Sequence, residues 1–156
     1  MIGPRIAGGL LAVATLTTAT ACASLDPSAR AEGATTVTAT ASTRPTDHLE
    51  ELLQQALPNV KGKTFTAAIV DLPPDARAKP HRHGQAFVYA YVLEGTVRSQ
   101  LDGKPVTTYH QGQNWVEQPG AHHLLTENTS PVKAAKLLVV FVSNTGDSLK
   151  SDDPGS

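Results

Sequence analysis

Short runs rich in β-branched residues recur through residues 64–142, and turns containing glycine or proline separate them. Asp102-Gly103 stands between two of these runs, and Asp-Gly is typical of a two-residue hairpin loop. Glu94-Gly95 marks another turn between two runs. The predicted strands are residues 64–72, 87–93, 96–101, 105–109, 114–117, 122–127 and 137–142. A spacing of roughly 8–12 residues between strands predicts an all-β barrel or sandwich.

One short α-helix is expected before these strands. Asp47 and Glu50 have the spacing of a capping box, with Asp in place of Ser or Thr. The apolar residues that follow the helical period i, i+3, i+4, i+7 and i+8 are Leu49, Leu52, Leu53, Ala56 and Leu57. Pro58 would end this helix.

Residues 1–23 have the pattern of an export signal. Arg5 is the only charged residue before Asp26, and residues 6–16 form an apolar stretch of the length expected for a signal-peptide core. Two processing sites fit. Cleavage after Ala23 would leave a mature chain that starts at Ser24, whereas processing as a bacterial lipoprotein would leave a lipid on Cys22. The expected location is therefore periplasmic, extracellular or membrane-anchored, with membrane contact only through a lipid at Cys22.

The remaining chain divides by composition into three parts. Residues 24–46 have few large apolar side chains and are expected to form a disordered linker. Residues 47–145 form the predicted folded domain, and the polar residues 146–156 form a predicted disordered tail. The net charge of −1 argues against a nucleic-acid partner, and a single cysteine excludes an intramolecular disulfide framework.

The histidines are the strongest candidates for chemistry. His81 and His83 are separated by one residue, so on a strand both imidazoles point to the same face. A second pair, His122-His123, follows after Pro119-Gly120. Two histidines from one strand and one from another make a three-nitrogen set that suits Fe, Mn, Ni, Cu or Zn. We therefore expect one divalent transition metal held by His81, His83 and His123.

At these residues the chain resembles the small single-domain cupins. The segment PHRHGQAFVYAYVLEG is similar to the first cupin motif, which is matched at His81, His83 and Gly95. The segment GQNWVEQPGAHH is similar to the second, which is matched at Gly112, Gly120 and His123. The resemblance covers residues 64–142 and implies a double-stranded β-helix with the metal inside the barrel. It also permits a homodimer.

This sequence departs from the family pattern in the metal-binding carboxylate. The glutamate of the first motif falls on Phe87 or Val88, and neither side chain can bind a metal. Gln85 continues the alternation from His81 and His83 and is a candidate for the fourth ligand. Glu117 is the carboxylate nearest the second motif and is the candidate general base. A metal without the carboxylate is more positive and favours anionic or neutral oxygen donors.

The resemblance implies an oxidoreductase of the dioxygenase type that acts on a small organic molecule. Two alternatives stay open: a non-catalytic cupin that binds a small ligand, and a metal-assisted isomerase or lyase. Phe87, Tyr89 and Tyr91 share one strand face, so they either line the cavity or pack between sheets. Trp115 is expected in the core.

Overall fold

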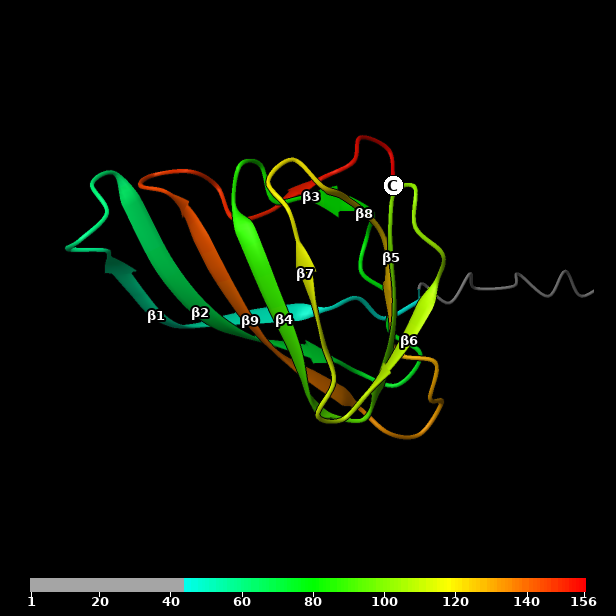
Figure 1. Ribbon diagram of the computed structural model, residues 1–156. Helices are drawn as coiled ribbons and strands as arrows, with labels where there is room; N and C mark the ends of the chain where they lie inside the picture. Colours follow the sequence, from blue (N-terminus) through cyan, green and yellow to red (C-terminus); the bar gives the residue numbers. More distant parts are fainter. Residues whose placement is uncertain (1–43) are drawn as a thin grey trace, which may run out of the picture. The chain divides into compact units, whose positions relative to one another are not determined.

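The computed structural model describes residues 44–156, and residues 1–43, which include the predicted export signal and most of the predicted linker, lie outside the described part. The described residues all belong to one compact unit. This unit consists of two antiparallel sheets of five strands each that face one another (Figure 1). Within residues 44–156, no helix is long and apolar enough to cross a membrane.

The two sheets differ in the length of their strands. The first, which we call the long-strand sheet, contains in spatial order β1 (His48–Ala56), β2 (Lys63–Leu72), β9 (Ala135–Asn144), β4 (Phe87–Glu94) and β7 (Asn114–Glu117). The second, the short-strand sheet, contains β10 (Ser151–Asp152), β3 (His81–Arg82), β8 (His122–Glu127), β5 (Thr96–Leu101) and β6 (Thr107–His110). All seven predicted strands are present, which confirms the all-β, double-stranded β-helix prediction.

The predicted helix near residues 47–57 is wrong, because His48–Ala56 form strand β1. This strand pairs along its length with β2, from His48 opposite Asp71 to Ala56 opposite Thr64. Helix propensity is a weak preference, whereas the free edge of an apolar strand carries backbone groups that need hydrogen-bond partners. Of the apolar residues behind the helical pattern, Leu49 packs against the core, but Leu52 and Leu53 remain 55% and 50% exposed.

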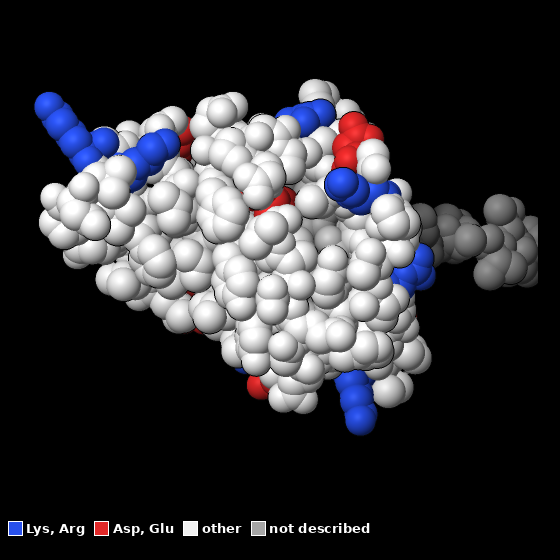
Figure 2. All heavy atoms as spheres, in the orientation of Figure 1, with Lys and Arg blue, Asp and Glu red and all other residues white. Residues whose placement is uncertain are grey.

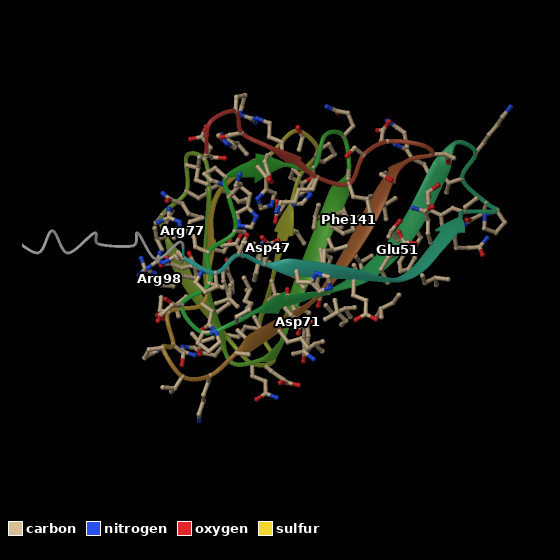
Figure 3. All side chains as sticks on the ribbon, turned by 180° about the vertical axis from the view of Figure 1, so that it is seen from behind. Asp47, Glu51, Asp71, Arg77, Arg98 and Phe141 are labelled. Carbon is tan, nitrogen blue, oxygen red and sulfur yellow. The ribbon has the colours of Figure 1, made fainter. Side chains whose placement is uncertain are left out.

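The core lies between the sheets and is built by strict alternation. Along β2 and β9, every second side chain is buried and the others are partly exposed. Phe141 is among the largest fully buried side chains and points inward from β9, whereas Asp71 and Glu51 lie on the outside (Figure 3). The side chains of Phe87, Tyr89 and Tyr91 alternate with the buried residues of β4 and therefore lie on the outer face, outside the cavity.

The predicted disordered tail, residues 146–156, does not match the structure. Ser151–Asp152 form β10, which pairs with β3, and Leu149 packs against the core. The side chain of Asp153 lies 2.7 Å from the ring of His122. Composition predicted a frayed end because only Leu149 is apolar there, but long-range pairing with β3 holds the backbone in place.

Candidate metal centre

Strand pairing brings the two sequence motifs together. In the short-strand sheet, β3 pairs with β8 so that His81 lies directly opposite His123. Residues opposite one another point to the same face of a sheet, and here that face is the barrel interior. His83 follows β3, and its side chain is 10% exposed. Ring nitrogens of all three histidines lie within 4.8 Å of one another, so the structure brings His81, His83 and His123 together.

Backbone carbonyls fix the tautomers of His81 and His83. His81 Nδ1 lies 2.6 Å from the carbonyl of Lys79, and His83 Nδ1 lies 2.5 Å from the carbonyl of Leu149. A carbonyl oxygen only accepts, so each Nδ1 carries the proton and donates it. In the neutral rings, both Nε2 atoms then have a lone pair and no proton.

These two lone pairs face each other. His81 Nε2 and His83 Nε2 are 3.2 Å apart. Two nitrogens that each lie about 2.1 Å from one ion, at an angle between about 90° and 110°, are roughly 3.0–3.4 Å apart. The spacing therefore fits two ligands of one metal ion, and a cation between them would remove the repulsion between the lone pairs.

Burial keeps the imidazoles of His81 and His83 neutral. It lowers the pKa of His81 to about 4, and it also lowers the pKa of His83, against the opposing effect of the Glu117 carboxylate. Metal ions bind the unprotonated ring, so protons compete little with a metal at neutral pH.

The two ring nitrogens of His123 have different partners: two hydroxyl groups contact Nε2, and the Glu117 carboxylate contacts Nδ1. Its Nε2 lies 2.8 Å from Ser99 Oγ and 2.9 Å from Thr126 Oγ1, and its Nδ1 lies 3.1 Å from Glu117 Oε1. Partners of this kind on the second nitrogen orient a ligating histidine. His123 is only 3% exposed, so its ring is buried in the barrel interior near the start of β8.

Glu117 places a carboxylate among the three imidazoles. It is 2% exposed, and Trp115 Nε1 donates to its Oε1 at 3.1 Å. Its Oε2 is buried without a hydrogen-bond partner and lies 3.8 Å from His83 Nε2. Burial alone would raise the pKa of Glu117, but the hydrogen bond from His123 and the nearby His123 and His83 rings lower it below its ordinary value. The carboxylate is therefore ionised and has one oxygen available for a cation or a proton.

The position of Glu117 accounts for the carboxylate missing from the first motif. Glu117 on β7 lies directly opposite Val88 on β4, and Val88 is one of the two positions on which the family glutamate falls. Side chains in directly opposite positions have Cβ atoms about 4.5–5.5 Å apart and point to the same face. A neighbouring strand thus supplies the carboxylate that β4 lacks.

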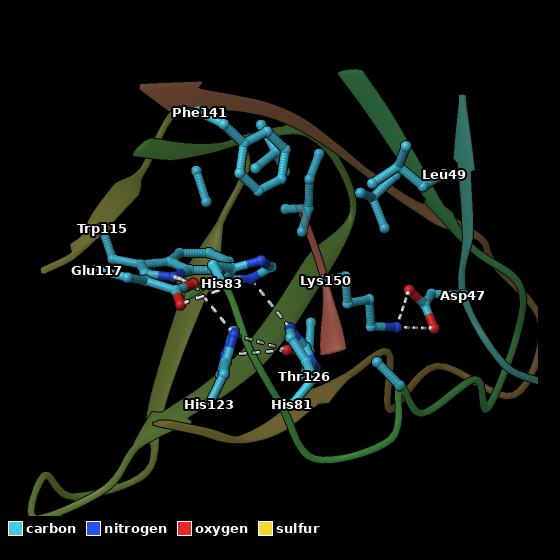
Figure 4. A pocket seen from close by; sticks show the side chains of 15 residues that line it. Asp47, Leu49, His81, His83, Trp115, Glu117, His123, Thr126, Phe141 and Lys150 are labelled. Atoms are coloured by element: carbon cyan, nitrogen blue, oxygen red, sulfur yellow. Dashed lines mark hydrogen bonds and ion pairs between the residues drawn. The ribbon is translucent and has the colours of Figure 1, made fainter. Parts of the chain in front are cut away.

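These groups line a small cavity between the sheets, and apolar side chains form most of its wall (Figure 4). The lining residues are Asp47, Leu49, Val70, Ala78, His81, His83, Ala90, Trp115, Glu117, His123, Thr126, Leu137, Val139, Phe141 and Lys150. The cavity volume is about 40 Å³. Water needs a cavity of roughly 10–15 Å³, so the space suits an ion with a small ligand.

Two charged residues that line the cavity were not among the predicted site residues. Asp47 begins the folded domain and Lys150 lies in its tail, and their side chains form an ion pair of 3.2 Å at the cavity. Sequence patterns gave no sign of this pair because its members are 103 positions apart. The assumption that the tail is disordered removed Lys150 from consideration.

Gln85 is a correction to the predicted ligand set. Its side chain is exposed, and it does not line the cavity. The prediction assumed that strand alternation continues from His83, but β3 ends at Arg82 and a turn follows in which Gly84 has a φ of 56°. His48 and His110 are exposed, and His122 contacts Asp153 outside the cavity.

The donor set fits a first-row divalent metal ion. Three imidazoles and one carboxylate are ligand types preferred by Fe, Mn, Ni, Cu and Zn. The unpartnered Oε2 of Glu117 and the facing Nε2 atoms of His81 and His83 are the atoms a cation would satisfy.

Comparisons with known proteins agree with this geometry. Residues 68–141 match the family described as "Cupin domain", and no curated protein matches the chain. The chain is similar to the DMSP lyase DddQ from Ruegeria pomeroyi DSS-3 at 18% identity and a TM-score of 0.58, over 72% of this chain and 54% of that one.

Two further structures extend the comparison. The Cnp3 cupin domain of Schizosaccharomyces pombe is similar at 16% identity and a TM-score of 0.52, over 64% of this chain and 62% of that one. An oxalate oxidase is similar at 24% identity and a TM-score of 0.53, over 64% of this chain and 52% of that one. The chain covers less than two thirds of each of these three structures, and likeness at these identities concerns the fold.

Proposed function

We propose that this chain, whose residues 68–141 form a cupin domain, is an exported metal-dependent oxidoreductase of the dioxygenase type that acts on a small organic molecule. One observation carries the metal-dependent part of the proposal. The unprotonated Nε2 atoms of His81 and His83 face each other at 3.2 Å, beside His123 and an ionised, buried Glu117. Two of the similar structures are named as enzymes, a DMSP lyase and an oxalate oxidase.

The protein groups have distinct roles in this proposal. His81, His83 and His123 hold one divalent ion, which would supply Lewis acidity and a template for the substrate. Phe141 lies against the ring of His83 with centroids 5.2 Å apart, and with the other apolar wall residues it excludes water. Trp115 donates to Oε1 of Glu117, so Oε2 remains to bind the ion or to accept a proton from the substrate.

Metal content tests the site directly. We expect about one transition-metal ion per chain in the purified protein, and little in a His81→Ala/His123→Ala double variant. A His110→Ala variant is the matched control, because His110 is exposed and lies outside the cavity. Chelation should lower the melting temperature of the wild type and of the control, but not that of the double variant. Equal metal content in all three proteins would place the ion elsewhere.

Glu117→Gln separates the two roles of the carboxylate. If Glu117 is a ligand, the variant should lose at least tenfold in metal affinity. If it is a general base, metal content should remain while turnover falls by 10²–10⁴-fold. Unchanged metal affinity together with unchanged turnover would remove Glu117 from the site.

Oxygen consumption distinguishes the proposed reaction from its alternatives. A dioxygenase consumes oxygen in step with the loss of a phenolic or enolic substrate. Turnover without oxygen consumption would favour the isomerase or lyase, and a ligand-dependent rise in melting temperature without turnover would favour a binding protein.

The outer face of the long-strand sheet supports a homodimer. Most of its side chains are apolar and partly exposed, and Figure 2 shows few charged atoms over β2, β9 and β4. The residues are Phe65, Ala67, Ile69, Phe87, Tyr89, Tyr91, Leu138, Val140 and Val142. Light scattering should give twice the chain mass, and a Tyr89→Lys variant should give the mass of one chain.

A further inference from the structure

Lys150 brings a positive charge to the cavity from the tail of the domain. The tail is held at the backbone by the pairing of Asp152 with His81 and by the Leu149 carbonyl, which accepts from His83. The hydrogen bond between Asp153 and His122 adds a third attachment. Lys150 is thus fixed by neighbours on both sides, and the tail that carries it is bonded to two of the metal-binding histidines.

The ammonium group has capacity for another partner. Among residues 44–156, its only hydrogen bonds go to the two carboxylate oxygens of Asp47, at 3.2 and 3.4 Å, and a carboxylate oxygen of Asp152 lies at 3.4 Å. Charge-assisted N–H···O bonds are usually about 2.7–2.9 Å long, and an ammonium has three donors. A carboxylate inside the cavity can therefore approach Lys150 more closely than Asp47 does.

The ion pair and the acidic group of the site lie apart. In Figure 4, Lys150 and Asp47 lie on the side of the cavity away from Trp115 and Glu117, and the histidines lie between them. With a divalent ion, the charged lining residues Glu117, Asp47 and Lys150 give the cavity a net charge of +1, and the exposed Asp152 does not line it.

We propose that the cavity takes a small anionic substrate, and that Lys150 binds its carboxylate while another oxygen of the substrate faces the metal-binding histidines. This inference rests on the proposed function and names its substrate class. Asp47 is a positioning residue that keeps the Lys150 side chain at the cavity. Apolar walls and a volume of about 40 Å³ limit the substrate to a few non-hydrogen atoms.

A pair of probes of nearly equal shape tests the inference. Glycolate carries a carboxylate and glycolamide carries an uncharged amide in its place. Calorimetric titration of the metal-loaded full chain should show glycolate binding at least tenfold more tightly than glycolamide. Lys150→Met should lose at least tenfold in glycolate affinity and leave glycolamide affinity unchanged, whereas Lys150→Arg should retain most of the glycolate affinity.

Lys136 provides the matched control. It pairs with Asp71 at 3.4 Å, as Lys150 does with its neighbours, but it lies outside the cavity. Lys136→Met should bind glycolate like the wild type. Equal affinity of wild type and Lys150→Met for glycolate would overturn the inference, as would equal affinity of the wild type for the two probes.

Metal content, measured in every variant, keeps this test distinct from that of the proposed function. If Lys150→Met retains its metal and loses affinity for glycolate, both the proposed function and the inferred substrate class are supported. If the wild type holds its metal and shows no preference for glycolate, the substrate class is wrong and the metal site stands. If the wild type holds no metal, the proposed function fails, and the inference fails with it.

Discussion

The two sheets bury different kinds of side chain toward the same interior. The long-strand sheet buries mainly apolar residues, such as Leu72, Val92 and Phe141. The short-strand sheet buries polar ones, including His81, Ser99, His123 and Thr126. Burying apolar area stabilises a fold, whereas burying polar groups costs free energy unless they find partners. One sheet therefore supplies most of the stability, and the other supplies most of the metal ligands.

Truncation of Phe141 should give the largest effect on stability. Replacing a buried phenylalanine by alanine costs about 3–5 kcal/mol because it removes apolar contacts and leaves a cavity. Phe141→Ala should lower the free energy of unfolding by this amount in urea titrations. Val140→Ala is the matched control, because its side chain lies on the outer face of the same strand, and it should cost about 1 kcal/mol. Equal losses would contradict the assignment of the core to the inner face.

Acid should lower the free energy of unfolding of the metal-free protein, because His81 in the short-strand sheet is buried. The pKa of His81 is about 4 in the folded chain, against an ordinary value of 6.5, so the unfolded chain binds the proton first. Stability is therefore present in full above about pH 6.5 and is lost as the pH falls toward 4. The loss is on the order of 3 kcal/mol.

A variant isolates this contribution from that of other acidic groups. His81→Ala should lose less stability than the wild type between pH 6.5 and 4, whereas the exposed His48→Ala should follow the wild type. Urea titrations of chelator-treated proteins at several pH values measure the difference. Identical pH profiles for wild type and His81→Ala would show that burial of this ring does not depress its pKa.

The junction between the sheets should give a smaller effect. Gly95 connects β4 of one sheet to β5 of the other and has a φ of 75°. A Cβ there would lie 2.9 Å from the carbonyl oxygen of Ala134 and 3.0 Å from Ala135. We expect Gly95→Ala to cost about 2 kcal/mol, from backbone strain and overpacking together.

Gly103 separates these two causes. It has a φ of 70° in the hairpin between β5 and β6, and a Cβ there would meet nothing within 4 Å. Gly103→Ala should therefore show only the conformational cost, about 1 kcal/mol. If both variants lose the same stability, the close approach at the junction of the sheets contributes nothing.

Patterns among residues close together in the sequence were enough to predict most strands and the three histidines. Alternation and Gly-containing turns identified the strands, and the spacing of His81, His83 and His123 identified the three imidazoles. The errors arose where distant pairing decides the structure. β1 is a strand because β2 offers an edge, and the tail is ordered because it pairs with β3. Lys150 and Asp47 are 103 positions apart in the sequence, and only the tertiary structure brings them together.

Because Val88 and Glu117 face each other across two paired strands, an acidic side chain at either position reaches the same space. Two carboxylates there would repel each other in an apolar cavity, so one excludes the other. A pair of substitutions that moves the carboxylate from Glu117 to position 88 would therefore leave an acid in the same space. The location of such a ligand is therefore defined by two facing positions together, and a motif written along one strand includes only one of them.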